Sequence, residues 1–232
     1  MKNKVCFVIP DYNEGPVIAS VVSDLIRKTG DTLSYEIVVV NDASNDNTAM
    51  EASNAGAKVI NHILNTGSGG ATATGLSYAQ QNGFNVAATL DADGQHDSKD
   101  VLKGVKILQD SDADLLIGSR LLNSHGMSRV KIFGNQGLSI LTHFLFGVSV
   151  TDSQSGLRIF SNRALGELRW KTNGYEFCSE MLWRAKQRNL RISEYPIQAI
   201  YTEYSKSKGQ NNWNGINIVR SLLQRRIMEL FE

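Results

Sequence analysis

Short apolar runs alternate with amphipathic stretches through the first half of the chain. The apolar runs are rich in Val and Ile, as buried parallel strands are, and they cover residues 5–9, 36–40, 57–60, 85–90 and 114–117. The segments between them predict helices at residues 16–28, 48–54, 71–81 and 99–109. This alternation predicts an α/β fold with an open, mostly parallel sheet that is flanked by helices.

The alternation ends near Arg120. A largely apolar helix is predicted at residues 131–148, and the pattern then predicts a strand at 157–160, helices at 162–170 and 175–188, and a strand at 190–196. A basic amphipathic helix follows at the end of the chain. We therefore expect one main domain over residues 1–210 and a C-terminal amphipathic helix over residues 211–232 that contacts a membrane or a partner.

The composition is that of an ordinary soluble protein, with 41% hydrophobic and 20% charged residues. The net charge of +1 gives no reason to expect nucleic acid as a partner. The two cysteines, Cys6 and Cys178, fit neither a disulfide framework nor a metal-binding spacing. The N-terminus lacks the apolar segment of a signal peptide, and polar residues interrupt the greasiest stretch at 140–150. We expect a cytoplasmic protein.

Polar clusters follow four of the predicted strands, at residues 11–14, 41–42, 91–93 and 118–120. Ligands of open α/β sheets bind at the carboxyl ends of the strands. The sequence therefore predicts a ligand site built from these four clusters.

The third cluster places Asp91, Asp93 and Asp97 within seven residues. Asp97 can cap the helix that begins near residue 99, but capping does not explain the first two carboxylates. Alternation along an extended segment points Asp91 and Asp93 the same way, together with Gln95. Oxygen ligands of this kind suit Mg²⁺ or Mn²⁺. His96 is a further candidate ligand, but we interpret it as a surface or helix-start residue.

The glycine-rich stretch at residues 65–75 matches neither standard nucleotide-binding template. The last glycine of a G-x-G-x-x-G motif is replaced by Thr72, and the lysine of a P-loop by Leu76. Two interpretations stay open: a tight strand-to-helix turn, or close approach of the backbone to a ligand.

An ordered series of short motifs runs along the chain: Pro10-x-Tyr12-Asn13-Glu14, Val40-Asn41-Asp42, Asn65-x-Gly67, Asp91-Ala92-Asp93-x-Gln95-His96, Gly118-Ser119-Arg120 and Ser155-Gly156-Leu157-Arg158. Over residues 4–208 this series resembles the family 2 glycosyltransferases, and within them the dolichyl- and polyprenyl-phosphate sugar transferases. The resemblance implies a GT-A-like catalytic domain, a nucleotide-sugar donor and a divalent metal ion, Mg²⁺ or Mn²⁺.

The resemblance also implies roles for individual residues. The metal ligands would be Asp91, Asp93 and Gln95, and the catalytic residues would include Asp93 and Arg120. The donor would contact a larger set: Pro10, Tyr12, Glu14, Val40, Asp42, Asp91, Ala92, Asp93, Arg120 and Lys208. The chain departs from the family pattern at Asn41, Gly94 and Thr202; Thr202 stands where related enzymes often carry arginine, and Lys206 is the candidate replacement.

Two acceptors fit the resemblance. A lipid phosphate is already anionic at neutral pH and needs no strong base. Its attack on the anomeric carbon, opposite the leaving nucleoside diphosphate, would invert the configuration. Its phosphate would contact basic candidates: Arg129, Lys131, Arg158 and Lys206. A saccharide hydroxyl would need a base, and Glu176 or Glu180 could serve. Structural alternatives are a Glu180–Arg184 helix pair and an internal salt-bridged turn around Arg158.

The leading hypothesis is therefore a metal-dependent, inverting transferase that acts on polyprenyl phosphate at the cytoplasmic face of a membrane. The segments at residues 131–148 and 216–228 would contact the membrane surface, a small membrane-anchor protein or a second copy in a homodimer. Packing of both segments on the domain itself is the structural alternative. The alternatives are transfer to a saccharide hydroxyl during surface polysaccharide synthesis and a non-catalytic nucleotide-sugar-binding protein. The sugar and the nucleotide base stay open.

Overall fold

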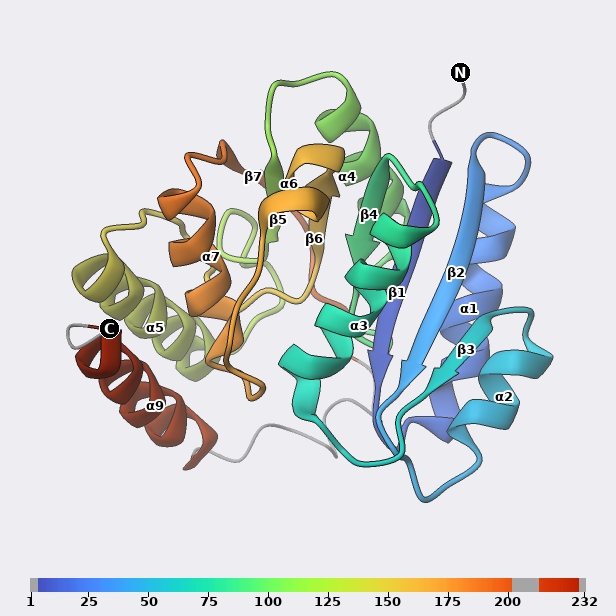
Figure 1. Cartoon of the computed structure of the whole chain (residues 1–232), viewed down its shortest axis with the longest axis horizontal. Coiled ribbons are helices and arrows are strands. Elements are labelled where there is room, and N and C mark those ends of the chain that lie inside the picture. The colour runs from blue at the N-terminus through green and yellow to red at the C-terminus, as the bar shows by residue number, and fades with distance from the viewer. Residues whose placement is uncertain (1–3, 202–212, 230–232) are drawn as a thin grey trace.

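The computed structural model describes residues 4–201 and 213–229. Strands and helices alternate along these residues (Figure 1): β1 (Lys4–Asp11), α1 (Gly15–Thr29), β2 (Ser34–Asn41), α2 (Thr48–Asn54), β3 (Lys58–Asn61), α3 (Gly67–Gln81), β4 (Val86–Thr89), α4 (Ser98–Gln109), β5 (Leu115–Ser119), α5 (Arg129–Phe146), β6 (Arg158–Ser161), α6 (Asn162–Glu167), α7 (Phe177–Gln187), β7 (Ile192–Pro196) and α9 (Trp213–Glu229).

The strands form one sheet in the order β3-β2-β1-β4-β6-β5-β7. All neighbours pair in parallel except β6, which runs antiparallel to both β4 and β5. The prediction of an open, mostly parallel sheet is confirmed. The carboxyl ends of β1, β2, β4 and β5 consequently meet at one edge of the sheet, where their polar loops lie together.

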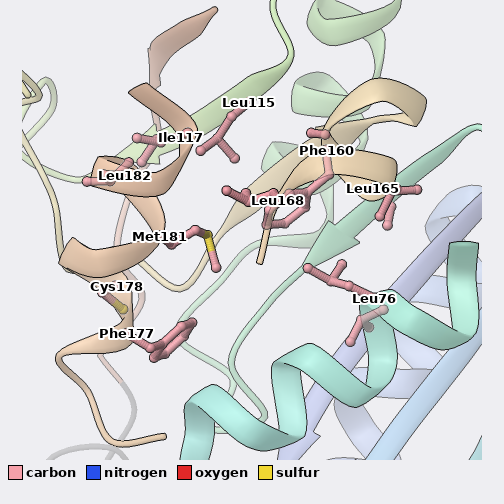
Figure 2. Packing of buried hydrophobic residues seen from close by; sticks show 14 of the residues in the cluster. Leu76, Leu115, Ile117, Phe160, Leu165, Leu168, Phe177, Cys178, Met181 and Leu182 are labelled. Atoms are coloured by element: carbon pink, nitrogen blue, oxygen red, sulfur yellow. The ribbon is translucent and has the colours of Figure 1, made fainter. Parts of the chain in front are cut away.

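Helices cover both faces of the sheet (Figure 1), with α1, α2 and α4 on one face and α3, α6 and α7 on the other. The alternation along β1 explains this arrangement, because Cys6 and Val8 enter one core cluster and Phe7 enters the other. Figure 2 shows Phe177, Met181 and Leu182 of α7 gathered with Leu115 and Phe160 of the sheet. The core thus fixes α7 beside the end of β5.

The glycine-rich stretch forms the first turns of α3, so this helix begins earlier than predicted. Gly67 has a φ of +82° and lies against the backbone of Asn173, and Gly75 packs on Val8 of β1, where a Cβ would collide with the valine side chain. The stretch therefore allows tight contact between helix, loop and sheet. Gly67 also lines the cavity described below.

Helix α5 begins at the cap residue Ser128 and ends at Gly147 in the left-handed conformation. Helix α9 lies beside it (Figure 1), and its Ile218 and Leu222 are buried in the core cluster that also contains Phe146. Among the described helices, none combines the length and the hydropathy that a membrane crossing requires.

Candidate active site

A cavity of about 1010 Å³ opens at the carboxyl edge of the sheet. Loops after β1, β2, β4 and β5 contribute to it, and so do α5, α7 and α9. Most of the residues proposed from the sequence line this cavity: Pro10, Tyr12, Glu14, Asp42, Asp91, Ala92, Asp93, Gln95, Arg120, Lys131 and Arg158. Lys206, Lys208 and Thr202 lie outside the described residues.

The loops after β1 and β2 are tied to each other. The Asn13 N–H donates to Ser44 Oγ over 2.9 Å, and the Asn45 N–H donates to Asn13 Oδ1 over 2.8 Å. The Glu14 N–H donates to Thr48 Oγ1 over 3.0 Å. These bonds hold Asn13 at a φ of +57°, a conformation that asparagine tolerates better than most residues. The two loops therefore form one fixed wall of the cavity.

Asp42 is buried at the end of β2, where its carboxylate accepts four hydrogen bonds. The donors include the N–H groups of Thr66 and Gly67, at 2.8 Å and 2.7 Å, and the Thr66 hydroxyl at 2.8 Å. His62 Nδ1 lies 2.7 Å from Asp42 Oδ1. Burial raises the pKa of Asp42, but these hydrogen bonds outweigh burial and hold the pKa below its usual range. Asp42 is an ionised carboxylate in a fixed orientation.

Asp91 and Asp93 follow β4 and have different electrostatic environments. Burial raises the pKa of Asp91, but a hydrogen bond with His96 and the charges of Arg120 and Arg158 outweigh burial and lower that pKa. Burial and the charge of Asp91 raise the pKa of Asp93 to about 6. The Gln95 side-chain amide donates to Asp93 Oδ2 over 2.6 Å. The two carboxylates thus differ in acidity and repel each other.

The donor set fits a divalent cation that is shared with a substrate. Among the residues that the structure describes, no three His, Cys, Asp or Glu side chains are grouped to hold a metal ion. Asp91 and Asp93 would supply two carboxylates, and the Gln95 amide oxygen could supply a third ligand. Mg²⁺ and Mn²⁺ accept a few carboxylates when substrate phosphates complete the shell, and such an ion would offset the repulsion that raises the Asp93 pKa.

Arg120 follows β5 and is oriented by the buried Asp152. Its Nε donates to Asp152 Oδ2 over 2.7 Å, and its Nη2 donates to Oδ1 over 2.9 Å. Asp152 also accepts from the Arg120 backbone N–H, and Glu194 in turn accepts from the Asp152 N–H. Burial lowers the pKa of Arg120, but the paired Asp152 outweighs burial and raises it. A permanent cation therefore stands beside the Asp91–Asp93 strip, and Asp152 uses only two of its five guanidinium N–H groups.

Comparisons with known proteins place the chain in a family. The sequence model of the family described as "Glycosyl transferase family 2" matches residues 6–168. The chain belongs to this family. It is 38% identical, over the full length of both chains, to the UDP-N-acetylglucosamine–dolichyl-phosphate N-acetylglucosaminyltransferase of Methanococcus voltae. It is 29% identical to the undecaprenyl-phosphate mannosyltransferase of Micrococcus luteus, over 88% of this chain and 87% of that one.

The fold of this glycosyltransferase is also found among solved structures. Glucosyl-3-phosphoglycerate synthase from Mycobacterium tuberculosis, in complex with Mn²⁺, UDP and phosphoglyceric acid, superposes with a TM-score of 0.73. The match covers 97% of this chain and 78% of that chain at 20% identity. The expected GT-A-like fold is confirmed.

Four of the described residues proposed from the sequence do not line the cavity of the glycosyltransferase: Val40, Arg129, Glu176 and Glu180. Val40 is fully buried in the core, so only its backbone could meet a donor. Arg129 is exposed at the start of α5. Glu180 is fully buried, where it accepts from the N–H groups of Lys171 and Thr172 and pairs with Arg184 and Arg225. These contacts favour a structural role for Glu180 over that of a general base.

Arg158 lines the cavity but is almost wholly buried. It donates to the carbonyls of Ser155 and Ser153 over 3.0 Å and 2.8 Å, and its guanidinium lies over the Phe177 ring. The turn around Arg158 is internal, as the structural alternative predicted. The ion pair expected within it, between Arg158 and Asp152, is not formed, because Asp152 binds Arg120. Much of the hydrogen-bonding capacity that Arg158 would offer an acceptor phosphate is therefore already used.

Three residues of the site were missed or misread. The interpretation of His96 as a surface residue was wrong, because its ring is buried and Nε2 lies 3.0 Å from Asp91 Oδ2. Asp152 and His62 hold Arg120 and Asp42. Two local signals existed, the position of His96 beside the acidic strip and that of His62 directly after β3. Asp152 follows no strand, and its pairing with Arg120 forms only in the folded chain.

Proposed function

We propose that this glycosyltransferase moves a sugar from a nucleotide-sugar to a polyprenyl phosphate, with a divalent ion and with inversion at the anomeric carbon. The observation that carries the proposal is one cavity that joins the Asp91–Asp93 strip and Arg120 to the apolar wall of α5. The names of the two relatives, both sugar transferases to lipid phosphates, support this choice of acceptor.

The donor would lie against the loops after β1, β2 and β4. Tyr12, Glu14 and Asp42 would contact the nucleoside. An ionised carboxylate cannot donate, so Asp42 would accept from an N–H group of the base. Asp91, Asp93 and Gln95 would hold the divalent ion, which supplies Lewis-acid stabilisation of the departing diphosphate. The Mn²⁺ and UDP bound to the solved neighbour support this arrangement.

The reaction would need little proton transfer from the protein. A phosphate monoester has a second pKa of about 6, so the phosphate oxygen that attacks the sugar is largely anionic at neutral pH. Arg120 would stabilise negative charge on the phosphates through its free N–H groups. A saccharide hydroxyl would need a base, and neither Glu176 nor Glu180 lines the cavity. That observation favours a lipid phosphate.

The acceptor would enter along α5. Lys131 lines the cavity with its ammonium 4.4 Å from the centre of the Tyr201 ring, and Phe133 and Leu138 from the same helix add apolar surface. Lys131 would bind the acceptor phosphate. Arg129 does not line the cavity, but its neighbours Ser128 and Val130 do, and it would add positive charge there. The apolar residues would contact the first isoprene units.

The outer face of α5 suits a membrane surface. Val130, Phe133, Ile140 and Phe144 are exposed along one stripe of this helix, and both Phe133 and Phe144 are 80% exposed. The stripe begins at the cavity, which Val130 and Phe133 also line, and continues outward to Phe144. The helix contains no acidic residue and begins with Arg129 and Lys131. An apolar stripe with flanking cations is the pattern of an interfacial helix. A second copy or a small membrane-anchor protein are the alternative occupants.

The proposed function is tested by transfer in vitro. Purified protein would be incubated with radiolabelled nucleotide-sugars, polyprenyl phosphate and detergent, with and without EDTA. We expect label in the lipid fraction with one donor of the panel, and loss of that label with EDTA. Label in an added saccharide but in no lipid, across the whole panel, would reject the lipid acceptor.

A further inference from the structure

His62 lies behind the cavity, at the point where β3 leads into α3. Its side chain is only 14% exposed, and it does not line the cavity. Nδ1 lies 2.7 Å from Asp42 Oδ1, and Nε2 lies 3.0 Å from the hydroxyl of Thr74 on α3. The His62 backbone N–H also donates to the Asn41 carbonyl over 2.9 Å. The imidazole therefore bridges the end of β2 to the body of α3.

The hydrogen-bond pattern fixes where the protons are. An ionised carboxylate only accepts, so His62 Nδ1 must carry the proton that it shares with Asp42. Asp42 Oδ1 then accepts from His62, the Thr66 N–H and the Thr66 hydroxyl. Within residues 4–201 and 213–229, Asp42 Oδ2 accepts from one donor, the Gly67 N–H at 2.7 Å. Each oxygen of a carboxylate has two lone pairs, or about four acceptor positions in all. The donors around Oδ1 therefore saturate it, whereas Oδ2 can accept from one more donor.

The remaining capacity of Oδ2 gives the cavity one hydrogen-bond acceptor of fixed direction, on the wall where the nucleotide-sugar would bind. Asp42 lines the cavity, and no rotation of its carboxylate is free, because turning it would break contacts from both the Thr66–Gly67 turn and His62. A buried acceptor of fixed direction discriminates strongly between a ligand atom that donates and one that accepts. Uracil presents a ring N–H at its pairing edge, whereas cytosine presents a bare ring nitrogen at the corresponding position. The lone pairs of cytosine and of the carboxylate would repel each other.

We propose that His62 is a positioning residue that holds Asp42 so that the site selects a base with a ring N–H, uridine over cytidine nucleotides. The inference rests on the proposed function, because it assumes that the nucleoside of the donor contacts Asp42. Thr74 is part of the same device, since its hydroxyl fixes the far nitrogen of the ring.

Two substitutions separate the contacts of the ring. His62→Asn keeps an N–H group near the position of Nδ1 and can still donate to Asp42. His62→Gln places its amide near the position of Nε2, so it retains the Thr74 contact and loses the one to Asp42. His125→Gln, at an exposed histidine in the loop between β5 and α5, is the matched control. Melting temperatures would confirm that each variant is folded.

The measurement is calorimetric binding of UDP, CDP and inorganic diphosphate, each with Mn²⁺. We expect the wild-type protein to bind UDP more tightly than CDP. His62→Gln should lose roughly tenfold in UDP affinity, the loss of about one hydrogen bond to a charged group, and most of the preference over CDP. Diphosphate affinity should not change, because that ligand has no base. His62→Asn should recover most of the UDP affinity, and His125→Gln should behave as wild type.

Different results would overturn the proposed function and the role of His62. If the wild-type protein binds no nucleoside diphosphate with Mn²⁺, the proposed function falls. If it binds UDP and the UDP-to-CDP ratio is unchanged in His62→Gln, His62 does not set base selectivity. An equal loss of UDP and diphosphate affinity would also overturn the inference, because that result indicates general damage to the site. Should His62→Gln fail to fold, Thr74→Val provides the same test by removing the partner of Nε2, and an unchanged ratio there would overturn it equally.

Discussion

The two walls of the cavity are built from different kinds of side chain. On the donor wall, three charged groups are each held by a neighbouring side chain: Asp42 by His62, Asp91 by His96, and Arg120 by Asp152. On the wall formed by α5, Phe133 is 80% exposed, and the Lys131 ammonium lies over the Tyr201 ring. One wall is fixed by hydrogen bonds, and the other is apolar and accessible.

The difference indicates what each wall recognises. Buried charges that are held by hydrogen bonds discriminate between polar ligands of defined shape, because they reorganise little on binding. An exposed apolar helix binds by burying area and tolerates variation in its ligand. A nucleotide-sugar matches the first wall and a prenyl chain the second. Substitutions on the two walls should therefore affect different kinetic constants.

The largest effect is expected at the acidic strip. Asp93→Asn is nearly isosteric but removes an anionic ligand from the proposed metal site, so transfer should fall by about 10²-fold or more while the melting temperature changes little. The measurement is turnover at saturating Mn²⁺. Asp97→Asn is the control, because Asp97 caps α4 and pairs with Lys28 outside the cavity. Near wild-type turnover for Asp93→Asn would contradict the metal role.

A smaller and more selective effect is expected at the start of α5. Replacing Arg129 and Lys131 together by Ala should raise the apparent KM for polyprenyl phosphate by roughly tenfold or more, because charge-assisted contacts are lost. Donor affinity should stay within about twofold. Lys103→Ala with Lys106→Ala on α4 removes the same charge from exposed positions away from the cavity. Equal effects of both pairs would indicate only a change in net charge.

The exposed stripe should matter for vesicles more than for a soluble acceptor. Ile140→Ser with Phe144→Ser leaves the cavity lining unchanged and should weaken sedimentation with vesicles that contain anionic lipid by roughly tenfold, because exposed apolar area no longer enters the membrane. Ile63→Ser with Leu64→Ser is the control. Ile63 is 96% and Leu64 75% exposed, and both lie outside α5, in the loop between β3 and α3. Unchanged sedimentation of the α5 variant would assign the stripe to another partner.

The smallest effect concerns pH. The Asp93 pKa is raised to about 6, so below that pH a proton occupies a carboxylate that the metal ion needs. Mn²⁺ affinity should therefore be constant above pH 7 and about fourfold weaker at pH 5.5, in the range where free Asp is still ionised. Titration of Mn²⁺ at both pH values checks this. Equal affinity would mean that Asp93 does not bind the ion.

The sequence predicted the fold and the position of the site better than it predicted the partners within the site. Strand and helix positions follow from local periodicity, and the clusters at Asp42, Asp91 and Arg120 follow from their places after strands. The antiparallel direction of β6 could not be read, because a short apolar run looks the same in either direction. The burial of Glu180 and His96 depends on helices and loops that are distant in sequence, so their residue types alone gave the wrong environment.

The two-wall account is tested most directly by binding both ligands to the same protein. Calorimetry would measure the affinity for UDP with Mn²⁺ before and after saturation with a short-chain polyprenyl phosphate in detergent. The account predicts a ternary complex, in which UDP affinity changes by no more than about threefold because the two ligands occupy different walls. Loss of UDP binding in proportion to the concentration of polyprenyl phosphate would mean that both phosphates compete for one site, and would contradict the account.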